Sequence, residues 1–129
     1  MIITRVVPAV AAAALLMLGV LFSSGAVAEP SARAAGSCSI PQGGEHLGPT
    51  YLTSLTVSGT TCSTGLAVVK AYHACQVKHG GVSARCTSTV DGFRCTEKRG
   101  PSIPTEFYSS VSCQDHSKQV AYKYSQFTS

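Results

Sequence analysis

The stretch TTCSTGLAVVKAYHACQVKHGG, residues 60–81, decides the fold that this sequence predicts. Thr60 or Thr61 can cap a helix that runs from about Cys62 to Lys78, and the two glycines that close the stretch are a typical stop signal. At about 100° per residue the apolar side chains gather on one broad face, so we expect the helix to lie across a sheet. That face holds Cys62, Gly65, Leu66, Val68, Val69, Tyr72, His73 and Val77. The glycine on it predicts a close approach of the helix backbone to the sheet.

Strand patterns flank this helix on both sides. Before it, residues 51–58 alternate in polarity and predict a half-buried strand with one face formed by Tyr51, Thr53, Leu55 and Val57. After it, Asp91 and Gly92 stand between two strand-like runs, which is the signal of a two-residue hairpin. We therefore predict strands at about Ala84–Val90 and Phe93–Lys98. Strand periodicity places one set of side chains on the face toward the helix: Cys86, Ser88, Val90, Phe93 and Cys95.

The C-terminal third of the chain predicts two more strands. The segment Arg99–Thr105 is predicted to be a loop, because two prolines and a glycine in so short a run are poor strand material. A turn over residues 114–117 separates the strands that follow. Their inward residues are Phe107, Ser109, Val111 and Cys113 on the first and Val120, Tyr122 and Tyr124 on the second. The order β-α-β-β-β-β predicts an α+β fold, with one helix packed on an antiparallel, disulfide-stabilised sheet.

The N-terminal residues have the pattern of a secretory signal. A charge at Arg5 precedes the apolar run Val6–Phe22, and the sequence Ala-Val-Ala that ends at Ala28 supplies an A-x-A cleavage pattern. Cleavage after Ala34, where the pattern recurs, is an alternative. An uncleaved anchor helix is a second one, since the apolar run is barely long enough to span a bilayer.

This pattern divides the chain into three parts. We predict a signal peptide over residues 1–28, a flexible leader over 29–50 and a single domain over 51–129. The expected location is outside the cell or in its envelope, with no membrane segment after cleavage. Six cysteines suit such an oxidising compartment.

The cysteines are expected to form three disulfides. Six allow 15 pairings, and sequence alone does not choose among them. Cys62 and Cys75 point apart at opposite ends of the predicted helix, so each needs a different partner. Geometry ranks first the set Cys75–Cys86, Cys62–Cys95 and Cys38–Cys113. A zinc site is the competing interpretation, but no C-x-x-C pair occurs, and we expect neither a metal nor a cofactor.

The charge of the chain is mild and argues against one class of partner. The net charge is +4, and the basic residues are spread along the sequence rather than clustered. A nucleic-acid binder of this size is expected to have a basic stripe, so no nucleic-acid partner is predicted.

Two functional hypotheses follow. The first is a non-enzymatic binding module for an extracellular protein, with Arg99–Thr105 as a stiff, protease-inhibitor-like loop whose contact residues are Arg99, Ser102 and Ile103. The second is a small secreted hydrolase that acts on RNA or cell-wall polymer and uses His116 with a sheet carboxylate, Glu106. Glu97 is the alternative carboxylate, and Arg94 is the candidate cation. No G-x-S-x-G nucleophile motif is present, and His73 on the apolar helix face is expected to be a packed histidine.

The chain also resembles a known group of proteins. The residues that carry the resemblance are Thr61-Cys62 at a helix start, Val69 and Tyr72 within the helix, Gly92-Phe93-Arg94-Cys95, Cys113, and Val120-Ala121-Tyr122. Over residues 51–124 they resemble small secreted cysteine-containing actinobacterial proteins of unknown function. The resemblance implies export and an α+β disulfide fold, with Cys75 and Cys86 as a pair added in this chain. It implies no catalytic residue.

Overall fold

The computed structural model describes residues 35–128, so the predicted signal peptide and the first residues of the leader lie outside the described part. The elements, in chain order, are β1 (Gly36–Ser37), the 3-10 helix η1 (Pro41–Gly44), β2 (Tyr51–Ser58), α1 (Cys62–Lys78), β3 (Arg94–Ile103), β4 (Glu106–Asp115) and β5 (Lys118–Phe127). Within this range no helix is both long and apolar enough to cross a membrane.

Helix α1 begins and ends where the sequence predicts. The Thr61 hydroxyl caps it by accepting a hydrogen bond from the backbone N–H of Thr64, at 3.1 Å. Its buried residues are Gly65, Val68, Val69, Tyr72 and Gln76. The buried face is therefore narrower than predicted: Gln76 belongs to it, whereas Val77 is half exposed. The predicted close approach is confirmed, because a Cβ at Gly65 would lie 2.7 Å from a methyl of Val57.

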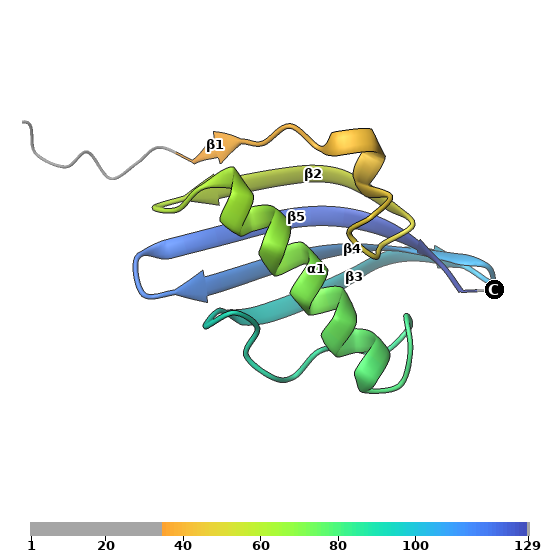
Figure 1. The fold of residues 1–129 in the computed structure, drawn as a ribbon. Coiled ribbons are helices and arrows are strands. Elements are labelled where there is room, and N and C mark those ends of the chain that lie inside the picture. Colours follow the sequence, from red (N-terminus) through yellow and green to blue (C-terminus); the bar gives the residue numbers. More distant parts are fainter. Residues whose placement is uncertain (1–34, 129) are drawn as a thin grey trace, which may run out of the picture.

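All strand pairs are antiparallel, and the sheet has the order β1-β2-β5-β4-β3. Helix α1 crosses one face of it diagonally, from the β1 side toward the β3 side (Figure 1). The other face, called the outer face below, is covered by no helix or strand of residues 35–128. The predicted α+β fold with one helix on an antiparallel sheet is confirmed.

The predicted strand at Ala84–Val90 is wrong. Only Val90 and Phe93 pair across the Asp91–Gly92 turn, so three strands rather than four follow the helix. The residues before the turn are held in another way. Cys86 forms a disulfide with Cys75 of the helix, and the Arg99 guanidinium donates a hydrogen bond to the carbonyl of Ala84, at 3.1 Å. This segment therefore runs between the helix and β3 without joining the ladder.

The predicted loop at Arg99–Thr105 is also wrong, because β3 continues to Ile103 and only the turn at Pro104 and Thr105 interrupts the chain before β4. The ladder shifts register between Arg99 and Ser102, which leaves Gly100 and Pro101 in a bulge. A proline is tolerated there because β3 lies at the edge of the sheet formed by residues 35–128.

A second bulge corrects the predicted faces of β2. Its ladder with β5 shifts register between Leu52 and Ser54, so one extra residue is accommodated at Thr53. Leu52 therefore lies on the core face with Leu55 and Val57, whereas Tyr51 is exposed. On β4 and β5 the predicted inward residues are all buried, as expected from unbroken alternation.

The part of the leader that the structure describes packs on the domain. β1 pairs with β2, the backbone N–H of Cys38 donates to the carbonyl of Leu55 at 2.9 Å, and η1 follows. β1 lies near the start of α1, whereas η1 lies toward the opposite end of β2 (Figure 1).

All six cysteines form disulfides, as predicted, but only one predicted pair is right. Cys75–Cys86 is confirmed, whereas the remaining pairs are Cys38–Cys62 and Cys95–Cys113. The predicted disulfides Cys62–Cys95 and Cys38–Cys113 are wrong, because the strand register gives Cys95 another partner and because the helix start lies far from Cys95. Cys95 stands directly opposite Cys113 in the β3–β4 ladder, and the helix start lies near the other edge of the sheet.

We predict that protease digestion of the unreduced protein yields three linked peptide pairs with the connectivity 38–62, 75–86 and 95–113. Mass spectrometry before and after reduction measures this directly. A peptide that links Cys62 to Cys95 would contradict the observed register of β3 on β4.

Candidate functional site

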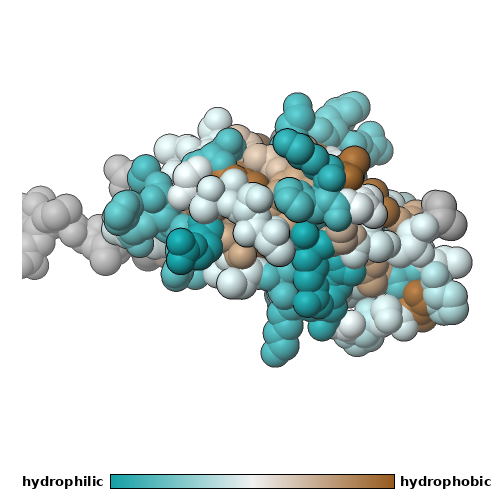
Figure 2. Space-filling model, turned by 90° about the horizontal axis from the view of Figure 1, so that it is seen from below, coloured by the Kyte–Doolittle hydropathy of each residue, from teal (hydrophilic) through white to brown (hydrophobic). Residues whose placement is uncertain are grey.

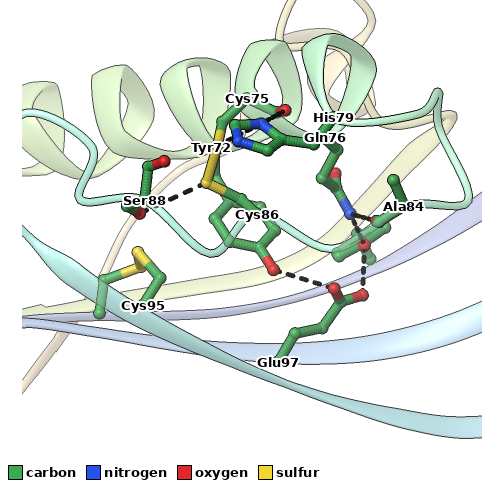
Figure 3. Close-up of a disulfide and its surroundings, with 11 residues drawn as sticks. Tyr72, Cys75, Gln76, His79, Ala84, Cys86, Ser88, Cys95 and Glu97 are labelled. Carbon is green, nitrogen blue, oxygen red and sulfur yellow. Dashed lines mark hydrogen bonds between the residues drawn. A yellow bond between two sulfur atoms is a disulfide. The ribbon is translucent and has the colours of Figure 1, made fainter.

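A buried carboxylate links the helix to three strands. The side chain of Glu97, on β3, is 1% exposed. Its Oε2 accepts a hydrogen bond from the Tyr72 hydroxyl of α1 at 2.9 Å, as Figure 3 shows. Its Oε1 accepts from the Tyr124 hydroxyl of β5 at 2.7 Å and from the Ser109 hydroxyl of β4 at 2.5 Å. The Arg99 Nε also donates to Oε1, at 2.7 Å, and completes an ion pair.

These contacts set the charge of the cluster. Burial acts to raise the pKa of Glu97, but the hydrogen bonds from Arg99, Ser109, Tyr124 and Tyr72 outweigh it and hold this pKa below its ordinary value. Burial and the neighbouring carboxylate raise the pKa of the Tyr72 and Tyr124 hydroxyls. The cluster therefore holds an ionised carboxylate among neutral hydroxyl donors.

A second layer of hydrogen bonds fixes these donors. The Gln76 side-chain amide of α1 donates to the Tyr124 hydroxyl at 2.9 Å and to the Ala84 carbonyl at 3.0 Å. The Arg99 guanidinium lies over the Phe107 ring, 3.8 Å from its centroid. With every oxygen of Glu97 engaged and the side chain enclosed, the cluster stabilises the fold and offers no open carboxylate to a substrate.

The residues of the hydrolase hypothesis lie far apart. Glu106 begins β4, and His116 follows its last residue, so the two are separated by the whole strand, about 30 Å at 3.4 Å per residue. The His116 side chain is 97% exposed, and its nearest carboxylate is Asp115, with 3.8 Å between Nε2 and Oδ1. The structure does not bring His116 and Glu106 together.

The three residues of the predicted binding loop also have different surroundings. The Arg99 side chain points to the core side and is bound to Glu97 and to the carbonyls of Ser83 and Ala84. Ser102 and Ile103 are exposed at the end of the β3–β4 hairpin. Only these last two present side chains to a partner.

His73 is packed, as predicted, but lacks a hydrogen bond at one ring nitrogen. Its Nδ1 is buried without a hydrogen-bond partner, and burial lowers the pKa of the imidazole. The ring lies so close to Gly48 that a Cβ there would be 2.2 Å from it, and Gly48 has a φ of +108°. This contact clamps the segment after η1 to the helix.

The outer face of the sheet is exposed to solvent and lined by polar side chains. Strand register aligns its side chains in rows that cross four strands. One row is Lys98, Ser110, Lys123 and Ser54, the next is Thr96, Ser112, Ala121 and Thr56, and the third is Arg94, Gln114, Gln119 and Ser58. These rows are built almost entirely from hydroxyl, amide and cationic groups.

Three hollows on this face adjoin one another and form what we call the outer trough. The central hollow, of about 510 Å³, shares Thr96 and Ser112 with a hollow of about 640 Å³ that extends to His116. It shares Lys98, Ser110 and Lys123 with a third, of about 370 Å³, that extends to Tyr108. The trough thus follows β3 and β4 for most of their length.

Three exposed cations of the trough have no acidic partner. Within residues 35–128 the ion pairs are those of Glu97 with Arg99 and of Asp115 with His116 and Lys118. None involves Arg94, Lys98 or Lys123, all of which are exposed. The central hollow therefore carries a net positive charge.

Aromatic side chains cluster at one end of the outer face. Tyr51 and Tyr108 flank Ser125 in the ladder, and the Phe127 ring meets the Tyr51 ring edge to face at 5.8 Å between centroids. All three rings are between 43% and 53% exposed. On the side of the molecule seen from below, hydrophobic residues form small areas among hydrophilic ones (Figure 2).

The sequence analysis named Glu97 only as an alternative catalytic carboxylate, and it predicted neither the buried Glu97 cluster nor the trough. The signal for both was the alternation of β3, where inward Cys95, Glu97 and Arg99 alternate with outward Arg94, Thr96 and Lys98. An inward acid and base two residues apart indicate a buried pair.

Among residues 35–128 no three His, Cys, Asp or Glu side chains converge as a metal site. Comparisons with protein-family models, curated proteins and solved structures found no match to this chain. The resemblance to actinobacterial secreted proteins therefore stays a prediction.

We predict that Glu97→Gln lowers the free energy of unfolding by about 3–5 kcal/mol, because it leaves the Arg99 guanidinium without its counter-charge. Urea unfolding followed by circular dichroism measures the change. Glu106→Gln is the matched control, since Glu106 makes no ion pair within the described residues, and its effect should stay within about 0.5 kcal/mol. Equal losses in the two variants would contradict the role given to Glu97.

The pH dependence of stability should carry the same signature. The pKa of Glu97 is lower in the folded protein than in the unfolded chain, where it is about 4.3. Its stabilisation is therefore fully present above about pH 4.3 and is lost as the pH falls through the folded-state value. The midpoint of urea unfolding, measured from pH 7 down to about pH 2.5, should fall less steeply with decreasing pH for Glu97→Gln than for the wild type. Parallel curves would contradict this prediction.

Proposed function

We propose that this chain is an exported, non-enzymatic binding module that holds an extracellular polysaccharide in the outer trough. The observation that carries the proposal is the continuity of the three hollows along β3 and β4. A groove of this length and openness suits a chain-like ligand better than a small molecule, which proteins usually enclose.

The chemistry of the trough favours sugar rings over a protein surface. Hydroxyl groups line its centre, from Ser54, Thr56, Thr96, Ser110 and Ser112. Tyr108 offers an exposed ring at one end. Hydroxyl groups can exchange hydrogen bonds with sugar hydroxyls, and an aromatic face can pack against a sugar ring. A protein interface would instead be expected to have a desolvated core rich in aromatic residues and methionine.

Binding is favoured over catalysis by the state of the titratable groups. Glu97 is enclosed by donors, and His116 and Glu106 stand at opposite ends of β4. A hydrolase that uses a paired acid and base needs both groups within reach of one bond, and these three residues do not meet that condition.

A protease-inhibitor role would have to use the β3–β4 hairpin end. The exposed Ile103 favours it, whereas the bound guanidinium of Arg99 does not. We therefore prefer the trough as the binding surface.

Export is supported by the disulfides. Three disulfides in so small a domain are typical of proteins that act in oxidising compartments. The signal pattern of residues 1–28 is the sequence basis for the same proposal.

Co-sedimentation with insoluble polysaccharides tests the proposal. The oxidised protein should be depleted from solution by at least one of peptidoglycan sacculi, chitin or hyaluronate-coupled beads. Tyr108→Ala should weaken that binding by about threefold to tenfold, because it removes an exposed ring from the trough.

Val77→Ala is the matched control, since Val77 is an equally exposed apolar residue on the helix side of the molecule. It should bind as the wild type does. Absence of binding to all three polymers, or an equal loss in both variants, would overturn the proposal.

A further inference from the structure

We propose that Lys98 and Lys123 form an anion clamp in the trough and select polysaccharides that carry carboxylates. This inference rests on the proposed function and goes further by naming the ligand class. It is carried by the row Lys98, Ser110 and Lys123, whose three side chains stand at the junction of two hollows.

The register of this row places the two lysines on either side of Ser110, on the same face of the sheet. Lys98 pairs with Ser110, and Ser110 pairs with Lys123, so the two lysines flank a small hydroxyl residue on the same face. Neighbouring strands are about 4.8 Å apart, which puts the two lysine Cα atoms about 10 Å from each other. Lysine side chains are long enough to converge across that gap. An anion above Ser110 would meet two ammonium groups and one hydroxyl.

No carboxylate of residues 35–128 forms an ion pair with either lysine of the clamp. Lys98 and Lys123 are exposed, and neither has an acidic partner within residues 35–128. The one carboxylate among the residues of the two joined hollows is Glu97, whose side chain is buried beneath the sheet and neutralised by Arg99. Like charges so close together repel, and a bound anion relieves that repulsion.

The sparseness of the cations decides between two kinds of anionic polymer. Along the whole trough the exposed, unpaired lysines and arginines are Lys98, Lys123 and Arg94. A nucleic acid has one phosphate per nucleotide and is bound by many cations along its track. A polysaccharide with a carboxylate on every second sugar has far fewer charges per unit length. The trough matches this lower charge density.

Isothermal titration calorimetry, which measures the affinity of the oxidised protein for three probes, tests the inference. The probes are a hyaluronate decasaccharide, the same oligosaccharide with its carboxylates reduced to alcohols, and an oligothymidylate of similar length, at about 0.15 M salt. The expected order is hyaluronate first, with the reduced oligosaccharide about tenfold or more weaker. Lys98→Gln and Lys123→Gln should each weaken hyaluronate binding by about threefold to tenfold, and added salt should weaken it further.

Lys70→Gln is the matched control, because it removes the same charge from an exposed position on α1, on the opposite side of the sheet. Its hyaluronate affinity should equal that of the wild type. An equal loss in Lys70→Gln, or tighter binding of oligothymidylate than of hyaluronate, would overturn the inference. Equal binding of both oligosaccharides would overturn the clamp while leaving the proposed function in place. If neither oligosaccharide binds, the clamp is overturned. The proposed function is decided separately, by the co-sedimentation experiment.

Discussion

The buried Glu97 carboxylate is the constraint on which the rest of the structure depends. Its oxygens take donors from α1, β4 and β5 as well as from its own strand, so it fixes the helix and three strands to one point. An ionised group enclosed in a protein must find all these partners at once, or the fold loses stability. The cluster thus selects one register of β3 on β4 and one position of the helix across the sheet. The cross-strand Cys95–Cys113 bond reinforces the same register.

This inner constraint is what leaves the outer face available. In β3, residues 95, 97 and 99 turn toward the helix and residues 94, 96 and 98 turn away from it, so one strand supplies both the buried anchor and part of the outer trough. The charges divide in the same way. The inward Arg99 is matched by Glu97, whereas the outward Lys98 has no acidic partner among the described residues. A rigid sheet with its own charges satisfied inside can present unsatisfied charges outside at fixed positions.

Sequence reasoning predicted those features that depend on local periodicity. The helix from Cys62 to Lys78 and the inward faces of β4 and β5 follow from unbroken patterns, and the structure confirms them. The errors arose where pairing in space overrides local preference. Asp91 and Gly92 do turn the chain, but within residues 35–128 β3 pairs with β4 and not with the segment before the turn, which no local pattern could reveal. Two disulfides were missed for the same reason, since the Cys95–Cys113 bond needs that register. The trough could be recognised only once the rows of separate strands were aligned.

The bulge at Gly100 and Pro101 has a consequence for how the molecule behaves among its own copies. β3 is an open edge strand, and an open edge is a template on which another chain can extend the sheet. The proline has no N–H to offer, and the bulge breaks the regular spacing of the donors beside it. A second copy paired in register along this end of β3 would therefore leave hydrogen bonds unmade. This small irregularity therefore disfavours growth of the sheet from that end of β3 and leaves the rim of the trough uncovered by a second copy.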